Sequence, residues 1–110
     1  MEHLPGIYLH FEDAFAGVHE AHQELARRCY DAGPIDERTA RLVKLGIAIG
    51  AQADGSVRSH TRRALSEGHS AEEIRHVAIL ALTTIGFPNM IAGLEWIEEV
   101  LAREVPSGAS

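Results

Sequence analysis

The sequence predicts an all-α protein, a bundle of about five helices, and three observations lead to this fold class. Apolar residues recur at spacings of three, four or seven along the first third of the chain, which is the stripe of an amphipathic helix. Ser70 and Glu73 have the S-x-x-E spacing of a helix-starting capping box. Glycine and proline pairs or single glycines then divide the remainder into helix-sized segments at Gly33-Pro34, Gly68 and Gly86.

The first helix is expected to be long, from about residue 6 to residue 32, and to end at Gly33-Pro34. Its apolar stripe consists of Ile7, Phe11, Phe15, Val18, Leu25 and Cys29. Cys29 lies in this stripe, so we expect it to be a small core residue rather than a nucleophile. Its basic neighbours are one and two positions away and do not face it on a helix.

The second helix is expected to begin with Asp36 as its cap and to lie in the middle of the domain, because it is apolar almost all round. Gly46 and Gly50 would give it a flat strip for close packing, at a cost of about 1 kcal/mol each in helix propensity. Asp54 or Ser56 can cap a third helix that stops at Gly68.

A fourth helix is expected from Ser70 to Gly86, and a fifth begins near Pro88, which suits a first turn. The apolar positions of the fifth helix are Met90, Leu94, Ile97 and Leu101. We expect one domain over residues 1–110, with a lead helix over about 6–32, core helices over about 36–103 and a frayed tail over 105–110.

Composition narrows the classes of function. A formal net charge of -6 opposes nucleic-acid binding, which needs a lysine and arginine surface. The chain has no apolar run long enough for a membrane span and no basic lead with an apolar signal core, so we expect a cytoplasmic protein with no membrane partner. One cysteine fits a reducing compartment. A chain of 110 residues buries a small core, so we expect it to assemble as a homo-oligomer.

Basic residues gather around one histidine. Arg58, Arg62 and Arg63 fall within six positions that also contain His60. His60 could act as a general acid or base, with Ser56 or Ser59 as a local hydrogen-bond partner, or it could be a partly buried structural histidine. Arg58 and Arg62 are i and i+4 and could together hold a carboxylate, or they could form salt bridges on a solvated face.

Other histidines give weaker signals. His19 and His22 are i and i+3, so two such pairs across a dimer could hold a metal, but no HExxH motif or carboxylate pair accompanies them. A packing seam is the simpler interpretation for His22 and for His76. His69 follows the glycine that ends the third helix and is expected to be a loop residue.

Several specific segments resemble one family. They are HTRRAL, the glycine that ends that helix, the SAEEI start and the GFP turn before the last helix, all within the run that begins IDERTARLVKLGIAIG. Together with the lead helix, they resemble the carboxymuconolactone decarboxylase family, which includes the alkyl hydroperoxidase D-like proteins. The resemblance covers nearly the whole chain. It implies an all-helical subunit that forms dimers, trimers or hexamers, with its site near subunit contacts.

The chain departs from the peroxidase members of that family, which have a C-x-x-C-x-x-x-H motif. The two cysteine positions are Ala53 and Ser56, His60 keeps the histidine position, and Arg41 stands at the upstream glutamate position. Neither alanine nor serine can form a disulfide. The family name therefore suggests a peroxiredoxin activity that this chain lacks the thiols to perform.

Decarboxylation of a lactone acid, the other activity the resemblance implies, needs no thiol and no cofactor. In this lyase hypothesis His60 delivers a proton, and Arg58, Arg62 or Arg41 anchors a small anionic substrate with Ser56 beside them. The alternative is a non-catalytic oligomer of the same fold that binds a small acid or is structural. Peroxidase activity ranks third and metal binding fourth.

Overall fold

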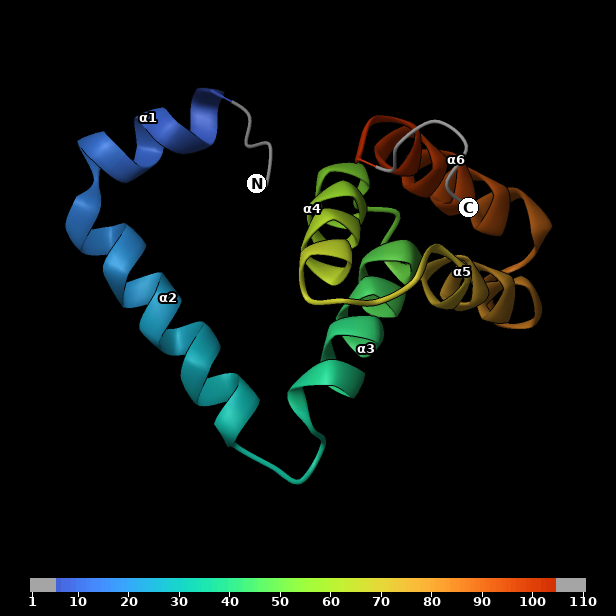
Figure 1. The fold of residues 1–110 in the computed structure, drawn as a ribbon, viewed down its shortest axis with the longest axis horizontal. Coiled ribbons are helices and arrows are strands. Elements are labelled where there is room, and N and C mark those ends of the chain that lie inside the picture. The colour runs from blue at the N-terminus through green and yellow to red at the C-terminus, as the bar shows by residue number, and fades with distance from the viewer. Residues whose placement is uncertain (1–5, 105–110) are drawn as a thin grey trace. The chain divides into compact units, whose positions relative to one another are not determined.

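The computed structural model describes residues 6–104 and confirms the predicted all-α class. The described residues form six helices and no strand, one helix more than expected (Figure 1). They fall into two compact units, residues 6–40 and residues 41–104, which are described separately below. The single domain expected over residues 1–110 stays a prediction, and the expected frayed tail over 105–110 lies outside the described residues.

The first unit contains two helices where one long helix was predicted. Helix α1 (Gly6–Ala14) and helix α2 (Ala16–Asp31) are separated at Phe15, whose φ and ψ of -131° and 51° are not helical, and they meet at an angle (Figure 1). Gly17, two residues after the break, disfavours a continuous helix. The rings of Phe11 and Phe15, 5.9 Å apart, pack against each other across the break, and His19 meets Phe11 edge-on. The helix predicted over about residues 6–32 is therefore not continuous.

Within the first unit, the apolar stripe covers no core. Neither α1 nor α2 contains a buried residue, and Phe15, Val18 and Leu25 are each more than half exposed. Cys29 is exposed as well, so its assignment as a core residue is wrong for the single chain. The apolar side chains of this unit are available to another surface.

Helix α3 (Glu37–Gly50) begins as predicted, because the Asp36 carboxylate accepts a 2.7 Å hydrogen bond from the Thr39 backbone N–H. Helix α4 (Asp54–Ser66) does not. Its N-cap is Ala53, with no side-chain hydrogen bond at the cap, so neither Asp54 nor Ser56 caps it. The Asp54 carboxylate lies one position too late and instead accepts a hydrogen bond from Arg58 one turn further on.

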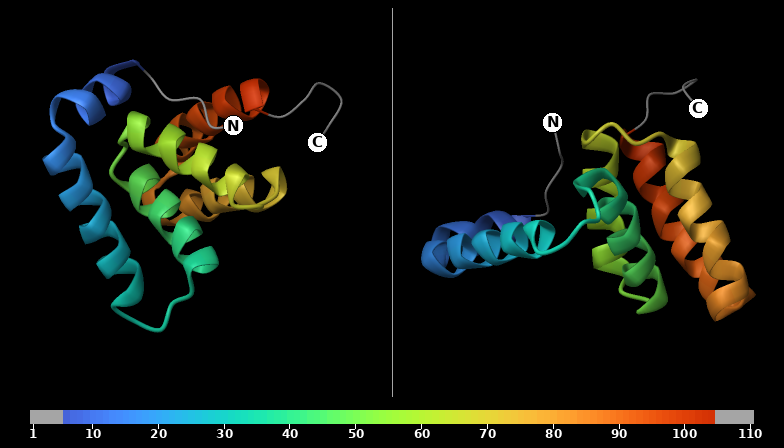
Figure 2. Two further views of the ribbon diagram at one scale, coloured as in Figure 1. Left: turned by 60° about the vertical axis from the view of Figure 1, so that its left-hand side comes forward. Right: turned by 90° about the horizontal axis from the view of Figure 1, so that it is seen from below.

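Helix α5 (Ala71–Ile85) starts at the predicted capping box. The Ser70 hydroxyl accepts from the Glu73 N–H at 3.0 Å, and the Glu73 carboxylate accepts from the Ser70 N–H at 2.9 Å. Gly86, with a φ of 88°, then turns the chain into helix α6 (Phe87–Glu104), where Pro88 lies in the first turn as expected. Helices α5 and α6 run side by side (Figure 2).

The core of the second unit is contributed by all four of its helices. Its buried residues are Leu45, Ala48, Ile49, Val57, Ala64, Ala71, Ile74, Ala78, Ile97 and Leu101. Helices α3 and α6 pack closely at Gly93 of α6, where an added Cβ would lie 2.8 Å from Cγ2 of Ile49. At Gly46, by contrast, a Cβ would meet Val77 at an ordinary 3.6 Å, and at Gly50 it would meet nothing. The flat strip predicted on α3 is therefore not used for close packing within the chain.

No helix in the described part of the chain combines the length and the apolar character needed to cross a membrane.

Candidate functional site

His60 lies in the middle of α4, and helical geometry determines which residues share its side of that helix. Residues three, four or seven positions apart point in the same direction. Ser56, Arg63 and Glu67 have these spacings from His60, with Glu67 at the C-terminal cap of α4. One side of α4 therefore presents a hydroxyl, an imidazole, a guanidinium and a carboxylate.

Arg41 of α3 joins two of these groups. Its Nη1 lies 2.7 Å from His60 Nδ1, while its Nε and Nη2 donate to the two carboxylate oxygens of Glu67 at 3.0 and 2.9 Å. Arg41 is only 6% exposed, so its charge requires this compensation. The two-pronged contact with Glu67 is the geometry in which guanidinium and carboxylate bind each other best.

His60 is held as a neutral ring at ordinary pH. Burial lowers the pKa of His60 from 6.5 to about 4, and the adjacent Arg41 cation adds to this effect. Lys44 and Arg63 act in the same direction, whereas Glu67 opposes it. Three positive charges thus surround the ring, so the site has a net positive potential without an imidazolium.

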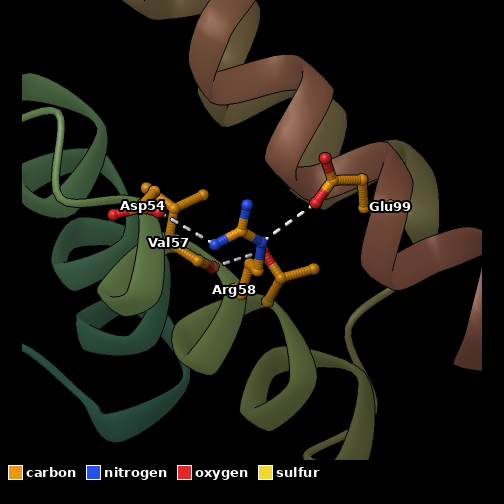
Figure 3. Close-up of polar contacts among 5 residues, drawn as sticks. Asp54, Val57, Arg58 and Glu99 are labelled. Atoms are coloured by element: carbon orange, nitrogen blue, oxygen red, sulfur yellow. Dashed lines mark hydrogen bonds and ion pairs between the residues drawn. The ribbon is translucent and has the colours of Figure 1, made fainter.

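Two of the three arginines predicted to hold a substrate, Arg58 and Arg62, lie on a different side of α4 from His60. Arg58 and Arg62 are each two positions from His60, and residues at that spacing do not face each other. Arg58 donates to Asp54 at 3.1 Å and to Glu99 of α6 at 3.0 Å. Figure 3 shows its guanidinium between these two carboxylates. Arg58 therefore links α4 to α6. Its salt bridges with Asp54 and Glu99 are partly exposed to solvent.

Arg62 shares the Arg58 side of α4 and is partly buried. Its Nε is enclosed without a hydrogen-bond acceptor among the described residues. The site predicted from the sequence therefore divides in two. Arg41 is brought to His60, whereas Arg58 and Arg62 are not.

Three residues at His60 were not assigned to the site from the sequence, although Arg63 was noted in the basic stretch. Arg63 and Glu67 could have been found, because the helical period places them on the His60 side of α4. Lys44 could have been found only through Arg41, which precedes it by three positions on α3. Ser56 lies one turn before His60, on the same side, but in the described structure it makes no hydrogen bond to the ring.

The other histidines considered in the sequence have different surroundings. His19 is 3.8 Å from Glu12, and His22 and His76 are exposed. His69 follows α4 as expected, but it is buried, with its backbone N–H donating to Ala64 O at 2.9 Å and its Nδ1 3.6 Å from Glu73. Within residues 6–104, no three His, Cys, Asp or Glu side chains come together in a way that could hold a metal ion.

The chain belongs to the carboxymuconolactone decarboxylase family, whose sequence profile matches residues 14–99. This match covers most of the chain and confirms the resemblance seen in the sequence. No curated protein and no solved structure was found to match it.

Family membership makes the start of α4 informative. Ala53 is the N-cap of this helix and Ser56 lies in its first turn. The resemblance described above aligns them with the two cysteines of the peroxidase motif. The one cysteine of the chain, Cys29, belongs to α2 in the other unit. What remains at the site is the polar cluster of Arg41, His60 and Glu67.

Proposed function

We propose that the chain is a cofactor-free enzyme that decarboxylates a small lactone acid, with His60 at the centre of its site. The observation that carries the proposal is the 2.7 Å contact between the buried Arg41 guanidinium and His60. A buried cation bonded to an imidazole is a costly arrangement, and such perturbed groups gather at functional sites.

The reaction would need an anion-stabilising site rather than a thiol. The bond between the carboxylate carbon and the lactone ring breaks, CO₂ leaves, and the electron pair passes into the conjugated lactone as a dienolate. Water supplies the proton that then adds to carbon. The negative charge of the dienolate lies largely on oxygen, where hydrogen-bond donors and a positive potential stabilise it.

Arg63 is the cation best suited to anchor a substrate carboxylate. It is exposed and shares a side of α4 with His60, and its charge already acts on the ring. Ser56, on the same side, supplies a hydroxyl. Arg58 is engaged by Asp54 and Glu99 and Arg41 by Glu67, which makes both less suited to a substrate than the sequence suggested.

The test is turnover of γ-carboxymuconolactone and related lactone acids. We expect the parent protein to release CO₂, His60→Ala to lower kcat by about 100-fold or more, and Arg63→Met mainly to raise KM. Arg62→Met tests the anchor predicted from the sequence. The matched control is Arg75→Met, which removes a guanidinium paired with Glu98 between α5 and α6 and should leave turnover unchanged. A parent protein without turnover on any of these acids would end the decarboxylase hypothesis.

The second candidate is a non-catalytic protein that binds a small acid. It is favoured by the internal pairing of Arg41 and Arg58 with carboxylates of the same chain. Calorimetric binding of the lactone acids without turnover would support it. Peroxidase activity is the third candidate, tested by peroxide consumption in the presence of thiols.

The partner that we propose besides the substrate is a second copy of the chain. Val43 and Ile47 of α3 are 45% and 66% exposed, and Leu80 of α5 is 60% exposed. They flank the place where α3 meets α5, marked by Gly46 and Val77. The segment from Val77 to Phe87 carries no charge, so it is a place where two chains of net charge -6 can meet without repulsion.

A further inference from the structure

We propose that Arg41 fixes His60 as a neutral imidazole whose proton is on Nε2, so that the ring serves the site as a hydrogen-bond donor and not as a cationic acid. The catalytic part of this inference rests on the function proposed above. Its structural part, the protonation and tautomer of the ring, is independent of any reaction.

The tautomer follows from what a guanidinium can do. An arginine has only N–H donors and no acceptor, so at 2.7 Å from Arg41 Nη1 the Nδ1 atom of His60 must accept. A ring that accepts at Nδ1 and is neutral carries its proton on Nε2. An imidazolium would place an N–H against another N–H and a positive charge against a positive charge.

Glu67 holds Arg41 in the position that makes this contact. Its carboxylate holds Nε and Nη2 of Arg41 through two hydrogen bonds, which leaves Nη1 directed at His60. Glu67 does not touch His60 through any hydrogen bond found among the described residues. Glu67 therefore positions Arg41, and Arg41 positions His60.

The surrounding charges keep the ring neutral. Arg41 and Lys44 approach from α3 and Arg63 from α4, and together with burial they hold the pKa of His60 at about 4, against the opposite effect of Glu67. Near neutral pH the role of a cationic acid would need a second ring proton, which a neutral imidazole does not hold. A neutral Nε2–H instead offers a fixed donor to the oxygen of a dienolate, which costs no reorganisation during the reaction.

The direct test is nuclear magnetic resonance of the histidine ring nitrogens in uniformly ¹⁵N-labelled protein, titrated from pH 8 to pH 4.5. His60 is assigned as the signal lost in His60→Gln. We expect a neutral ring with a protonated Nε2 across this range. Protonation near pH 6.5, or a proton on Nδ1, would overturn the proposal.

Two variants test the chain of positioning residues. Arg41→Met removes both the donor and the nearest cation, so the His60 midpoint should rise toward the ordinary value of 6.5 and the Nε2–H preference should weaken. Glu67→Gln keeps the cation but breaks the fork, so the ring should become a mixture of tautomers; this variant decides the matter if Arg41→Met does not fold. The control Glu98→Gln breaks the similar fork on Arg75 and should leave the His60 signals unchanged.

Kinetics test the role of the donor. The amide N–H₂ of glutamine reaches about as far as Nε2–H, so His60→Gln should keep roughly a tenth of kcat or more, whereas His60→Ala should lose about 100-fold. For a neutral donor, kcat should be flat between pH 5.5 and 8. A kcat that falls as the pH rises, with His60→Gln as inactive as His60→Ala, would show that the ring is an acid.

The two proposals can fail separately. If the parent protein turns over no lactone acid, the proposed function fails, while the nitrogen spectra still decide whether Arg41 sets the tautomer. If turnover is found but His60 titrates near pH 6.5, the function stands and the neutral-donor inference falls.

Discussion

At the scale of single residues, Arg41 is the feature that most needs a physical account. Isolated in the interior, its charge would cost several kcal/mol. The fork onto Glu67 offsets part of that cost, because the Glu67 side chain is 45% exposed and keeps its own contact with water. One of the other N–H donors, on Nη1, is satisfied by His60. The imidazole thus has a structural role for Arg41 in addition to the one proposed for it in catalysis.

The lowered pKa of His60 predicts a pH-dependent stability. Above pH 6.5 the ring is neutral in both the folded and the unfolded chain and contributes no pH dependence. Between pH 6.5 and about 4 the unfolded ring takes up a proton that the folded ring does not, so the free energy of unfolding falls as the pH falls. Because the ring is partly exposed to solvent, we expect a loss on the order of 2 kcal/mol.

Urea unfolding of the parent and of His60→Gln at one protein concentration measures this contribution. All other ionisable groups are common to the two proteins, so the difference between the two curves isolates His60. The parent should lose stability relative to the variant between pH 6.5 and pH 4. Parallel curves would mean that the folded ring protonates as readily as the unfolded one.

The sequence predicted this site only in part. The family resemblance placed Arg41 with His60 as a candidate substrate anchor, but their direct contact links α3 to α4 across 19 positions, and no period within one helix indicates it. Arg58 and Arg62 were grouped with His60 because they are near it in sequence. The helical period separates them from it and favours Arg63 and Glu67 instead.

At the scale of elements, predictions succeeded where the signal was local and complete. The side chains of Ser70 and Glu73 each accept a hydrogen bond from the other's backbone N–H, so the start of α5 could be predicted from the sequence alone. The start of α4 was ambiguous, because the Asp54 carboxylate could either cap the helix or pair with Arg58. In the structure it accepts a hydrogen bond from Arg58. Phe15 interrupts the predicted first helix although the apolar spacing continues past it. Apolar spacing predicts which residues share a helix face, but not whether the backbone hydrogen bonds are continuous.

Packing between helices gives a prediction at Gly93. In Gly93→Ala the new Cβ would lie 2.8 Å from Cγ2 and 3.2 Å from Cγ1 of Ile49, which is fully buried and cannot move away freely. We expect a loss of about 1–3 kcal/mol in the free energy of unfolding, measured in urea. Gly46→Ala is the matched control, because its Cβ meets Val77 at 3.6 Å and it should be neutral or stabilising by up to about 1 kcal/mol.

The same clash can be confirmed by a double-mutant cycle. Ile49→Ala alone creates a cavity and should cost about 2–5 kcal/mol. In the Gly93→Ala background it also removes the atoms that clash. The loss of stability in the double variant should therefore be smaller than the sum of the two single losses. Additive losses would show that Gly93 does not pack against Ile49.

At the scale of the whole molecule, the fold class was predictable because caps, stops and periodicity all indicate helices. The tertiary environment of the first unit was not. An apolar stripe indicates that a surface will be covered, but it does not say by what. Phe15, Val18 and Leu25 are more than half exposed, so the first unit does not bury this stripe by itself.

The proposed self-association through exposed apolar surfaces can be measured directly. Light scattering with size exclusion should give a mass that is a multiple of 12.0 kDa for the parent. Ile47→Glu or Leu80→Glu places a charge on the uncharged face beside the α3–α5 contact, where burying it unpaired in an interface would cost several kcal/mol. Each should shift the protein toward a smaller species, whereas Ala102→Glu, at an exposed position on α6, should not. A parent mass of one chain would contradict the proposed partner, and an unchanged mass in both charged variants would place the interface on another surface.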